Sequence, residues 1–359
     1  MPGWFPPRSP RLVTLLIAGV CALAALLVAA VVSVPYVALM PGPTLNTLGH
    51  SYNNAGKPDN QQLIQISGTR TYRTAGHLNL VTISYSGGPG TDFNIFSALR
   101  AWLTPDYAVV PQSEIFSTGQ TQQQVQQQDS QEMLGSQQDA TAAALCYLHI
   151  KFGTQDPVAA TVKGMPAYGV LKAGDVITAV DGTPVGTCQN QIVSMIQDRK
   201  PGADVTLTVL RNGVTKNITL ATKDVGGKPV VGVELGPATF KFPFNVKINL
   251  PGIGGPSAGL MFALGIIDKL TPDNLSGGKF IAGTGEIEPT GQLEPIGGIQ
   301  QKMAGARAAG ATVFLTPASN CVNTTGAVPA GLRLVKVSTL AGAVSELQAI
   351  KKGLPVPSC

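Results

Sequence analysis

The residues best suited to chemistry lie in the last third of the chain, and the first of them is Ser257. It sits in a Gly/Pro-rich turn between a predicted strand at 245–250 and a predicted buried helix at 260–270. The first peptide N–H groups of a helix are unpaired within it, and its dipole favours negative charge, so an oxyanion formed beside Ser257 would be stabilised there. A serine at this place is usually only a helix cap, however, so the turn alone does not define a site.

Lys302 is the second candidate, on a predicted helix that ends at Gly310. Helical spacing places it on one face with three apolar residues, which points it towards the core: Ile299, Met303 and Ala306. Burial lowers the pKa of a lysine, and a lysine brought to about 7–8 can act as a general base. Because no histidine follows His149, a Ser–Lys pair is the arrangement left for an activated serine within this block.

Four sequence runs resemble the Lon-type serine proteases, over about residues 230–350. In order, they are Gly255-Pro-Ser-Ala-Gly259, Thr284-Gly-Glu-Ile287, Gly291-Gln-Leu-Glu-Pro-Ile-Gly-Gly298 and Lys302. The resemblance implies that Ser257 is the nucleophile, that Lys302 is its base partner, and that Thr284 is a supporting hydrogen-bond group. Two features depart from the family: Gly254 stands where many Lon enzymes carry an acidic residue, and the ATPase half is missing.

Residues 151–225 resemble a PDZ domain of the bacterial protease-associated kind. The resemblance rests on the run Leu-x-x-Gly-Asp-Val-Ile-x-x-Val-Asp-Gly from Leu171 to Gly182, and Asn212-Gly213 predicts a hairpin nearby. It implies that a peptide binds as an added strand between a sheet edge at Pro157–Lys163 and a helix at Gln189–Arg199. The alternative is a structural spacer whose groove is blocked.

An apolar run at residues 12–34 is long enough to cross a membrane as a helix. Arg8 and Arg11 precede it and no basic residue follows before Lys57, so the positive-inside bias places residues 1–11 in the cytoplasm and the rest outside. We therefore expect a single-pass protein of the cell membrane with extracytoplasmic C-terminal domains. The alternative is a cleaved signal peptide, whose apolar core is normally shorter.

Four cysteines lie beyond the apolar run, and a fifth, Cys21, lies within it. An even number in an oxidising compartment fits two disulfides, and four cysteines allow three pairings. The order along the chain favours Cys146–Cys188 and Cys321–Cys359, while four free or buried thiols remain the alternative. Residues 35–150 are predicted to hold short strands and then one polar, glutamine-rich helix at Thr121–Leu148, interrupted or bent near Gly135.

Composition limits the other classes of function. Hydrophobic residues make up 44% and charged residues only 13%, and the net charge of +5 forms no dense basic stripe, so no nucleic-acid partner is expected. A phosphate-binding loop of the ATPase kind and a zinc-binding H-E-x-x-H motif are both missing from the sequence, so no cofactor or metal is expected. Lon-type domains often assemble into rings, so the resemblance raises a homo-oligomer as one partner, beside the membrane and the protein or peptide substrates.

Together these patterns predict an α+β or α/β protein with one N-terminal transmembrane helix, a small β-rich PDZ-like domain and a C-terminal Lon-type proteolytic domain. The leading hypothesis is an ATP-independent, membrane-tethered serine endopeptidase whose PDZ-like groove captures extracytoplasmic substrates. The alternative is a non-catalytic peptide-binding scaffold with an inactive Lon-type fold. Signal-peptide processing is disfavoured because Ser257 lies more than 200 residues from the anchor, with no adjoining membrane-associating surface in the sequence.

Overall fold

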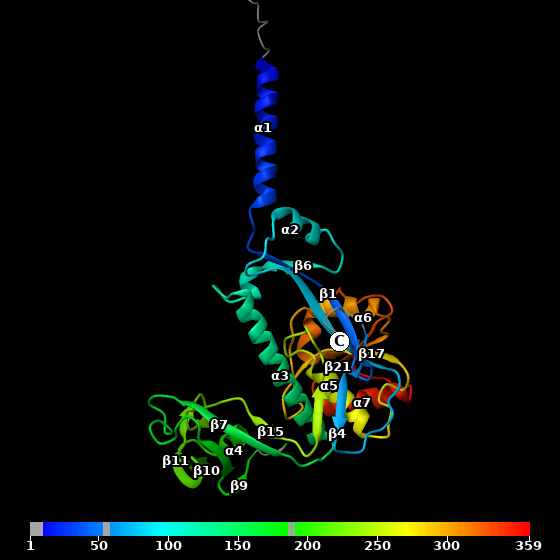
Figure 1. Ribbon diagram of the computed structural model, residues 1–359. Coiled ribbons are helices and arrows are strands. Elements are labelled where there is room, and N and C mark those ends of the chain that lie inside the picture. The colour runs from blue at the N-terminus through cyan, green and yellow to red at the C-terminus, as the bar shows by residue number, and fades with distance from the viewer. Residues whose placement is uncertain (1–9, 53–57, 186–187, 189–190) are drawn as a thin grey trace, which may run out of the picture.

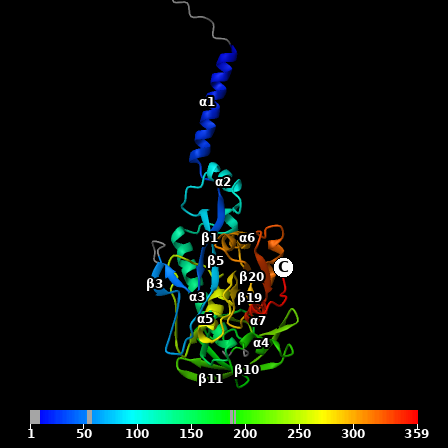
Figure 2. The ribbon, with the colours of Figure 1, turned by 90° about the vertical axis from the view of Figure 1, so that its right-hand side faces the viewer.

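The computed structural model describes residues 10–52, 58–185, 188 and 191–359. Most of the predicted cytoplasmic segment 1–11, Lys57 and the start of the predicted helix Gln189–Arg199 lie outside these residues. Figure 1 shows three parts along the molecule: the helix α1 (Pro10–Val31), a mixed α/β body, and a β-rich lobe at the far end. The perpendicular view in Figure 2 shows the same order, and the predicted mixed α/β class is confirmed.

Helix α1 projects from the body, and its apolar side chains make little contact with the rest of the protein. Its span Val13–Val31 is long and apolar enough to cross a membrane, and none of that span is buried. The core helix of a soluble protein would be mostly buried, so α1 needs another environment for its apolar side chains. A membrane anchor and a signal sequence both fit these features.

The body is built around a mixed six-stranded sheet in the order β21-β20-β17-β5-β1-β6. The first four strands of that order are parallel, whereas β1 pairs antiparallel with both β5 and β6. The sheet thus joins residues 36–111 to residues 280–337 in one core. Its strands are β1 (Tyr36–Asn46), β5 (His77–Gly87), β6 (Ala108–Pro111), β17 (Phe280–Gly283), β20 (Val313–Pro317) and β21 (Arg333–Val337).

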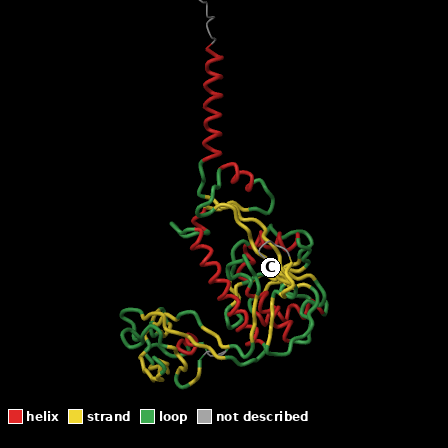
Figure 3. The backbone as a smooth tube through the Cα atoms, in the orientation of Figure 1, coloured by secondary structure: helices red, strands yellow, loops and turns green. Residues whose placement is uncertain are grey.

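Helices cover both faces of this sheet, as the colouring of Figure 3 makes visible. On β17, Ile281 belongs to the apolar cluster of α3, α5 and α7, while its neighbour Ala282 belongs to the cluster of α6. The helices are α2 (Ile95–Trp102), α3 (Gln122–Tyr147), α5 (Gly259–Leu270), α6 (Ile299–Ala308), α7 (Leu340–Lys351) and the short turns η1 (Gln112–Glu114) and η2 (Ala318–Thr324). Two-stranded pairs complete the body: β2 (His50–Tyr52) with β3 (Pro58–Gln62), β4 (Ile64–Ser67) with β16 (Asn245–Ile248), and β18 (Glu286–Ile287) with β19 (Leu293–Glu294).

Helix α3 confirms the predicted polar helix but corrects its shape. The side chain of Thr121 accepts from the backbone N–H of Gln124 and caps the first turn, and the helix then runs through Gly135 without a break. It is 26 residues long and buries Met133 and a run of alanines against α5, while most of its glutamines are exposed. The glycine is tolerated because packing of the flanking residues offsets its low helix propensity.

The lobe contains its own sheet and its own apolar core around α4 (Ile192–Gln197). The predicted hairpin is confirmed, with Asn212 and Gly213 both at positive φ between the paired residues Arg211 and Val214. Its strands are β7 (Gly153–Thr161), β8 (Val176–Val180), β9 (Thr183–Pro184), β10 (Asp204–Arg211), β11 (Val214–Ala221), β12 (Lys223–Val225), β13 (Lys228–Val230), β14 (Val233–Leu235) and β15 (Thr239–Lys241).

The lobe is inserted into the body rather than attached in series. The chain leaves the body at the end of α3 and re-enters it at β16, and β7 pairs with β15 at the base, where Gly153 lies opposite Lys241. The rings of Phe152, Phe240 and Phe242 pack together at this base, with centroids 5.4–5.9 Å apart. The lobe is therefore docked on a paired, aromatic-packed stalk.

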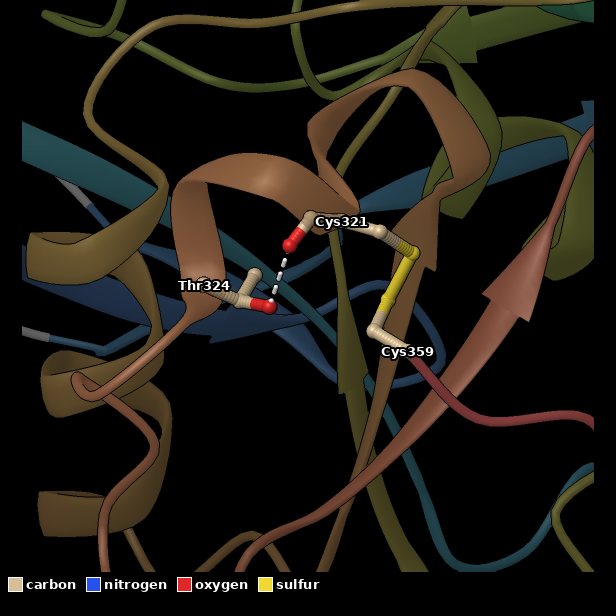
Figure 4. Close-up of a disulfide and its surroundings, with 3 residues drawn as sticks. All are labelled: Cys321, Thr324 and Cys359. Carbon is tan, nitrogen blue, oxygen red and sulfur yellow. Dashed lines mark hydrogen bonds between the residues drawn. A yellow bond between two sulfur atoms is a disulfide. The ribbon is translucent and has the colours of Figure 1, made fainter.

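Two disulfides match the pairing favoured by sequence order. Cys146–Cys188 ties the end of α3 to the lobe, and Cys321–Cys359 ties the C-terminus to η2. Figure 4 shows the second disulfide together with Thr324, whose hydroxyl donates to the carbonyl of Cys321 at 2.8 Å. Cys21 is a free, exposed cysteine in α1. The alternative of four free thiols is not what the structure shows.

Candidate active site

The candidate site forms where β17 ends, between α5 and α6. Thr284 follows the last residue of β17 and is fully buried. Its hydroxyl donates to the carbonyl of Ser257 at 2.9 Å, so Thr284 joins the end of the strand to the turn before α5. The carboxyl ends of parallel strands in α/β sheets are frequent places for sites, because the connecting turns converge there.

The turn that carries Ser257 is held from its other side by α3. The backbone N–H of Gly255 donates to the carbonyl of Asp129 at 3.0 Å, and the hydroxyl of Ser136 donates to the carbonyl of Pro256 at 2.8 Å. These contacts leave no mark in the sequence, because α3 lies more than 100 residues upstream and its polar residues fit a solvated face. Ser136 falls on the same helix face as Met133 and Ala140, and this polar position on an apolar face is the one signal that could have drawn attention to this part of α3.

Gly254 has a packing role that explains the departure from the Lon pattern. A Cβ atom built on Gly254 would lie 2.4 Å from the Cβ of Asp129, which is far inside van der Waals contact. An acidic side chain at this position would therefore displace α3. The glycine allows α3 to approach closely enough to hydrogen-bond the turn.

Lys302 reaches the turn from α6 and is only 2% exposed. Its Nζ lies 2.7 Å from Ser257 Oγ and 3.1 Å from Thr284 Oγ1. The predicted helix face is confirmed, because the three apolar residues that share it with Lys302 are buried. The structure therefore brings all three predicted site residues, Ser257, Lys302 and Thr284, into mutual contact.

Burial lowers the pKa of Lys302 to about 7. The cause is the loss of hydration around the ammonium group, which favours the neutral amine. A neutral Nζ has a lone pair and can accept the proton of Ser257 Oγ–H across the same short contact. The arrangement can therefore generate a nucleophilic oxygen near neutral pH without a histidine.

The backbone N–H groups at the start of α5 are not free, in contrast to the expectation from the sequence. The N–H of Gly259 donates to the carbonyl of Pro256, and that of Leu260 donates to the carbonyl of Gly285. In the part of the chain that the structure describes, the N–H groups of Ser257 and Ala258 have no hydrogen-bond acceptor. The donors left for an oxyanion are thus those of the turn itself rather than those of the first helical turn.

Acidic side chains gather between α3 and β18, one helical turn beyond Ser136. Burial, together with the smaller effect of the charges of Glu286 and Glu288, raises the pKa of Asp139 to about 6. Burial likewise raises the pKa of Glu286. Among the described residues, no group of three or more His, Cys, Asp or Glu side chains is arranged to hold a metal ion. The pKa of Asp139 therefore lies near neutral pH, close to the pKa of Lys302.

A groove in the lobe differs in position from the one predicted. The edge expected at Pro157–Lys163 is not free, because β7 pairs with β8 along one part and with β14 along the next. The strand β14 ends the sheet instead, and a cavity of about 340 Å³ lies between α4 and residues 229–235. The predicted edge is wrong because β14 lies beyond residue 225, the predicted end of the domain, and yet completes its sheet.

A second cavity continues from this groove towards the body. It measures about 200 Å³ and shares Ile192, Val193 and Leu235 with the groove. Its far wall includes the Cys146–Cys188 disulfide and Pro289 and Thr290 of the turn between β18 and β19. A chain lying in the groove would thus be led towards the turn between β18 and β19 of the body.

Comparisons with known proteins identify two domains. A PDZ domain family model matches residues 141–222, and a model of the Lon protease (S16) C-terminal proteolytic domain matches residues 245–349. The chain therefore combines a PDZ domain with a Lon-type proteolytic domain behind an N-terminal apolar helix. The Lon-type domain implies a serine peptidase.

The similar solved structures include three that each cover 21–23% of this chain. The PDZ domain of an SdrC-like protein from Listeria monocytogenes is 27% identical over 22% of this chain and 85% of that chain, with a TM-score of 0.21. Its counterpart from Listeria innocua is 25% identical over 23% and 92%, also at 0.21, and a Geobacillus thermodenitrificans protein is 35% identical over 21% and 85%, at 0.19. TM-scores this low carry no argument. No curated protein matches the chain.

The contact between Ser136 and Pro256 predicts a positioning effect on cleavage. Ser136→Ala should lower kcat for a peptide substrate by roughly tenfold or less, since one hydrogen bond contributes about 1 kcal/mol, with little change in KM. Steady-state kinetics on the full chain would measure this. Gln127→Ala, at an exposed position of the same helix, is the control and should match the unaltered chain. A change in KM alone would contradict the positioning role.

Proposed function

We propose that this protein is a membrane-anchored, ATP-independent serine endopeptidase that uses a Ser257–Lys302 dyad. The observation that carries the proposal is the 2.7 Å contact between Ser257 Oγ and a buried Lys302 Nζ whose pKa is lowered to about 7. An exposed lysine near its ordinary pKa would hold almost no neutral amine at pH 7. The contact and the burial are both needed for a lysine to act as a base.

The reaction follows from the placement of the three side chains. Ser257 Oγ attacks the peptide carbonyl as its proton moves to Lys302 Nζ, and the unpaired N–H groups of Ser257 and Ala258 are the donors available to the resulting oxyanion. Lys302 then gives the proton to the leaving amine, which leaves an acyl-enzyme on Ser257. Water that gives a proton to the same Nζ hydrolyses the ester. Thr284 is a positioning residue that keeps Nζ aimed at Oγ.

In this proposal the lobe delivers the substrate and α1 holds the protein at the membrane. A PDZ domain binds peptides as an added strand, and the free edge of β14 beside α4 offers that geometry. We propose that the groove captures segments of extracytoplasmic substrates and raises their local concentration near Ser257. We also propose that α1 is retained as the anchor, with the two disulfides in an oxidising compartment outside the cell membrane.

A peptide-binding scaffold with an inactive Lon-type fold is the competing function. It would retain the groove, but it would not need Lys302 buried without an acidic partner, which is costly for a site with no task. A serine-directed phosphonate or boronate probe separates the two. Labelling at Ser257 supports the peptidase, and an unlabelled folded chain supports the scaffold.

Substitution of the dyad gives the first prediction. Ser257→Ala and Lys302→Ala should each lower cleavage of an unfolded test protein by roughly 10³-fold or more. Without Lys302 the serine is not activated, and without Ser257 the lysine has no hydroxyl to activate. Lys269→Met is the matched control, since Lys269 is the other buried lysine among the described residues and bonds Gln62 rather than Ser257. Circular dichroism would verify folding. Undiminished cleavage by the Ser257→Ala chain would refute the dyad.

The pKa of Lys302 gives the second prediction. The amine must be neutral to act as a base, so kcat/KM should rise about tenfold per pH unit below pH 7 and level off above it. Peptide cleavage between pH 5 and pH 9 would measure this limb. The Asp139→Asn variant separates the two groups, because a limb that stays near 7 in that variant belongs to Lys302 rather than to Asp139. A flat profile would contradict the assignment.

Blocking the groove gives the third prediction. Val193 lines both cavities and is half exposed, so Val193→Glu should obstruct binding without unfolding the lobe. We expect KM for a long, unfolded substrate to rise roughly tenfold, because the groove no longer raises the local concentration of that substrate near Ser257. Short peptides should be cleaved as before. Val214→Glu, at the tip of the distant β10–β11 hairpin, is the control. Equal losses for both substrates would count against capture by the groove.

A further inference from the structure

Helix α2 packs its small residues inward and leaves its large apolar residues outside. Ala101 is buried, and Ala98 packs with it against Ala38 and Phe93 of the body. The outward arc of the same helix is apolar and exposed, with Trp102 at 71% and Leu103 at 68%, and it consists of Ile95, Phe96, Leu99, Trp102 and Leu103.

This arrangement is the reverse of that found in a helix whose outer face is exposed to water. Surface helices of soluble proteins turn their large apolar side chains to the core and their polar ones outward. Single exposed apolar residues need no explanation, but five on one arc form a contiguous patch of the kind that marks a binding surface. Alanines on the inner face let α2 lie close to the sheet, so burying the larger side chains there would require the helix to move away.

The position of α2 indicates what covers the patch. The backbone N–H of Val34 donates to the carbonyl of Phe93 at 2.7 Å, and the side chain of Asn94 donates to the carbonyl of Ala30 in the last turn of α1 at 2.8 Å. The same side chain caps α2 by accepting from the N–H of Ser97. Figures 1 and 2 both place α2 directly at the point where α1 meets the body. The patch is therefore fixed at the level where the apolar span of α1 ends.

We infer that α2 is an interfacial helix that lies in the outer surface of the phospholipid bilayer that α1 spans. Its apolar arc enters the boundary between headgroups and acyl chains, where tryptophan and tyrosine are favoured; Trp102 lies on this arc, and the exposed Tyr107 follows α2 in the chain. Arg100 is exposed at the margin of the arc, within reach of lipid phosphates. The inference rests on the proposed retention of α1 as an anchor.

A second membrane contact beside α1 limits how the body can move relative to the bilayer. One helix alone would let the body swing over the membrane, whereas two adjacent membrane contacts fix its tilt and height. The PDZ lobe then stands at the end of the molecule away from the bilayer. Helix α2 is then a membrane-associating surface next to the protease body, where the sequence indicated none.

Trp102 itself can report the depth of α2. The chain has two tryptophans, so Trp4→Phe leaves Trp102 as the only one. The full-length variant is reconstituted in vesicles of phosphatidylcholine and phosphatidylglycerol, with lipids brominated at successive positions along the acyl chain. We expect blue-shifted emission, strongest quenching by bromine near the headgroup, a depth of about 5–10 Å, and iodide quenching reduced several-fold relative to an exposed tryptophan.

The exposed reference is a matched variant with its single tryptophan far from α1. Trp4→Phe/Trp102→Phe/Val214→Trp carries it on the β10–β11 hairpin and should be quenched by iodide but not by brominated lipid. If Trp102 behaves like this reference, the inference fails. If Trp102 is shielded from iodide but untouched by brominated lipid, a second protein copy covers the patch and the inference also fails. A chain removed from the vesicles by alkaline carbonate refutes the anchor, whereas a retained chain with exposed Trp102 refutes α2 alone.

Discussion

The contact between a buried amine and a hydroxyl is the constraint on which the rest of the body depends. Lys302 Nζ has lost its hydration and lies within hydrogen-bond reach of Ser257 Oγ and Thr284 Oγ1. Burial without a carboxylate partner disfavours the charged form and makes the amine available near neutral pH. Such a group is tolerated only where packing holds it in place, and here α6 is held by apolar contacts along most of its length.

The other half of the contact is held by an element outside the block of Lon-like motifs. The turn of Ser257 is clamped between Thr284 at the end of β17 and Asp129 and Ser136 on α3. The far end of α3 is joined to the lobe by Cys146–Cys188. One continuous helix thus touches the turn of Ser257 at its middle and the PDZ lobe at its end, so the proposed dyad and the lobe share a support rather than a flexible linker.

The distribution of apolar surface divides the molecule into three environments. The body and the lobe bury their apolar residues in separate cores, while α1 and the outer arc of α2 expose theirs next to each other. Burial of apolar side chains drives folding in water, so a set that stays outside the cores calls for a different medium. The bilayer proposed at the α1 end supplies that medium, while the body and the lobe keep their apolar cores away from water.

The sequence by itself determined the features that depend on local pattern. Helical spacing identified the buried face of Lys302, the strand–turn–helix pattern placed Ser257, the length of the apolar run identified α1, and the order of the cysteines favoured the observed disulfides. The tertiary structure alone decided that α3 supports the turn of Ser257, that the PDZ lobe is an insertion whose groove lies along β14, and that α2 faces outward. Each of these depends on contacts between segments far apart in the chain, and short-range periodicity does not encode which surfaces meet.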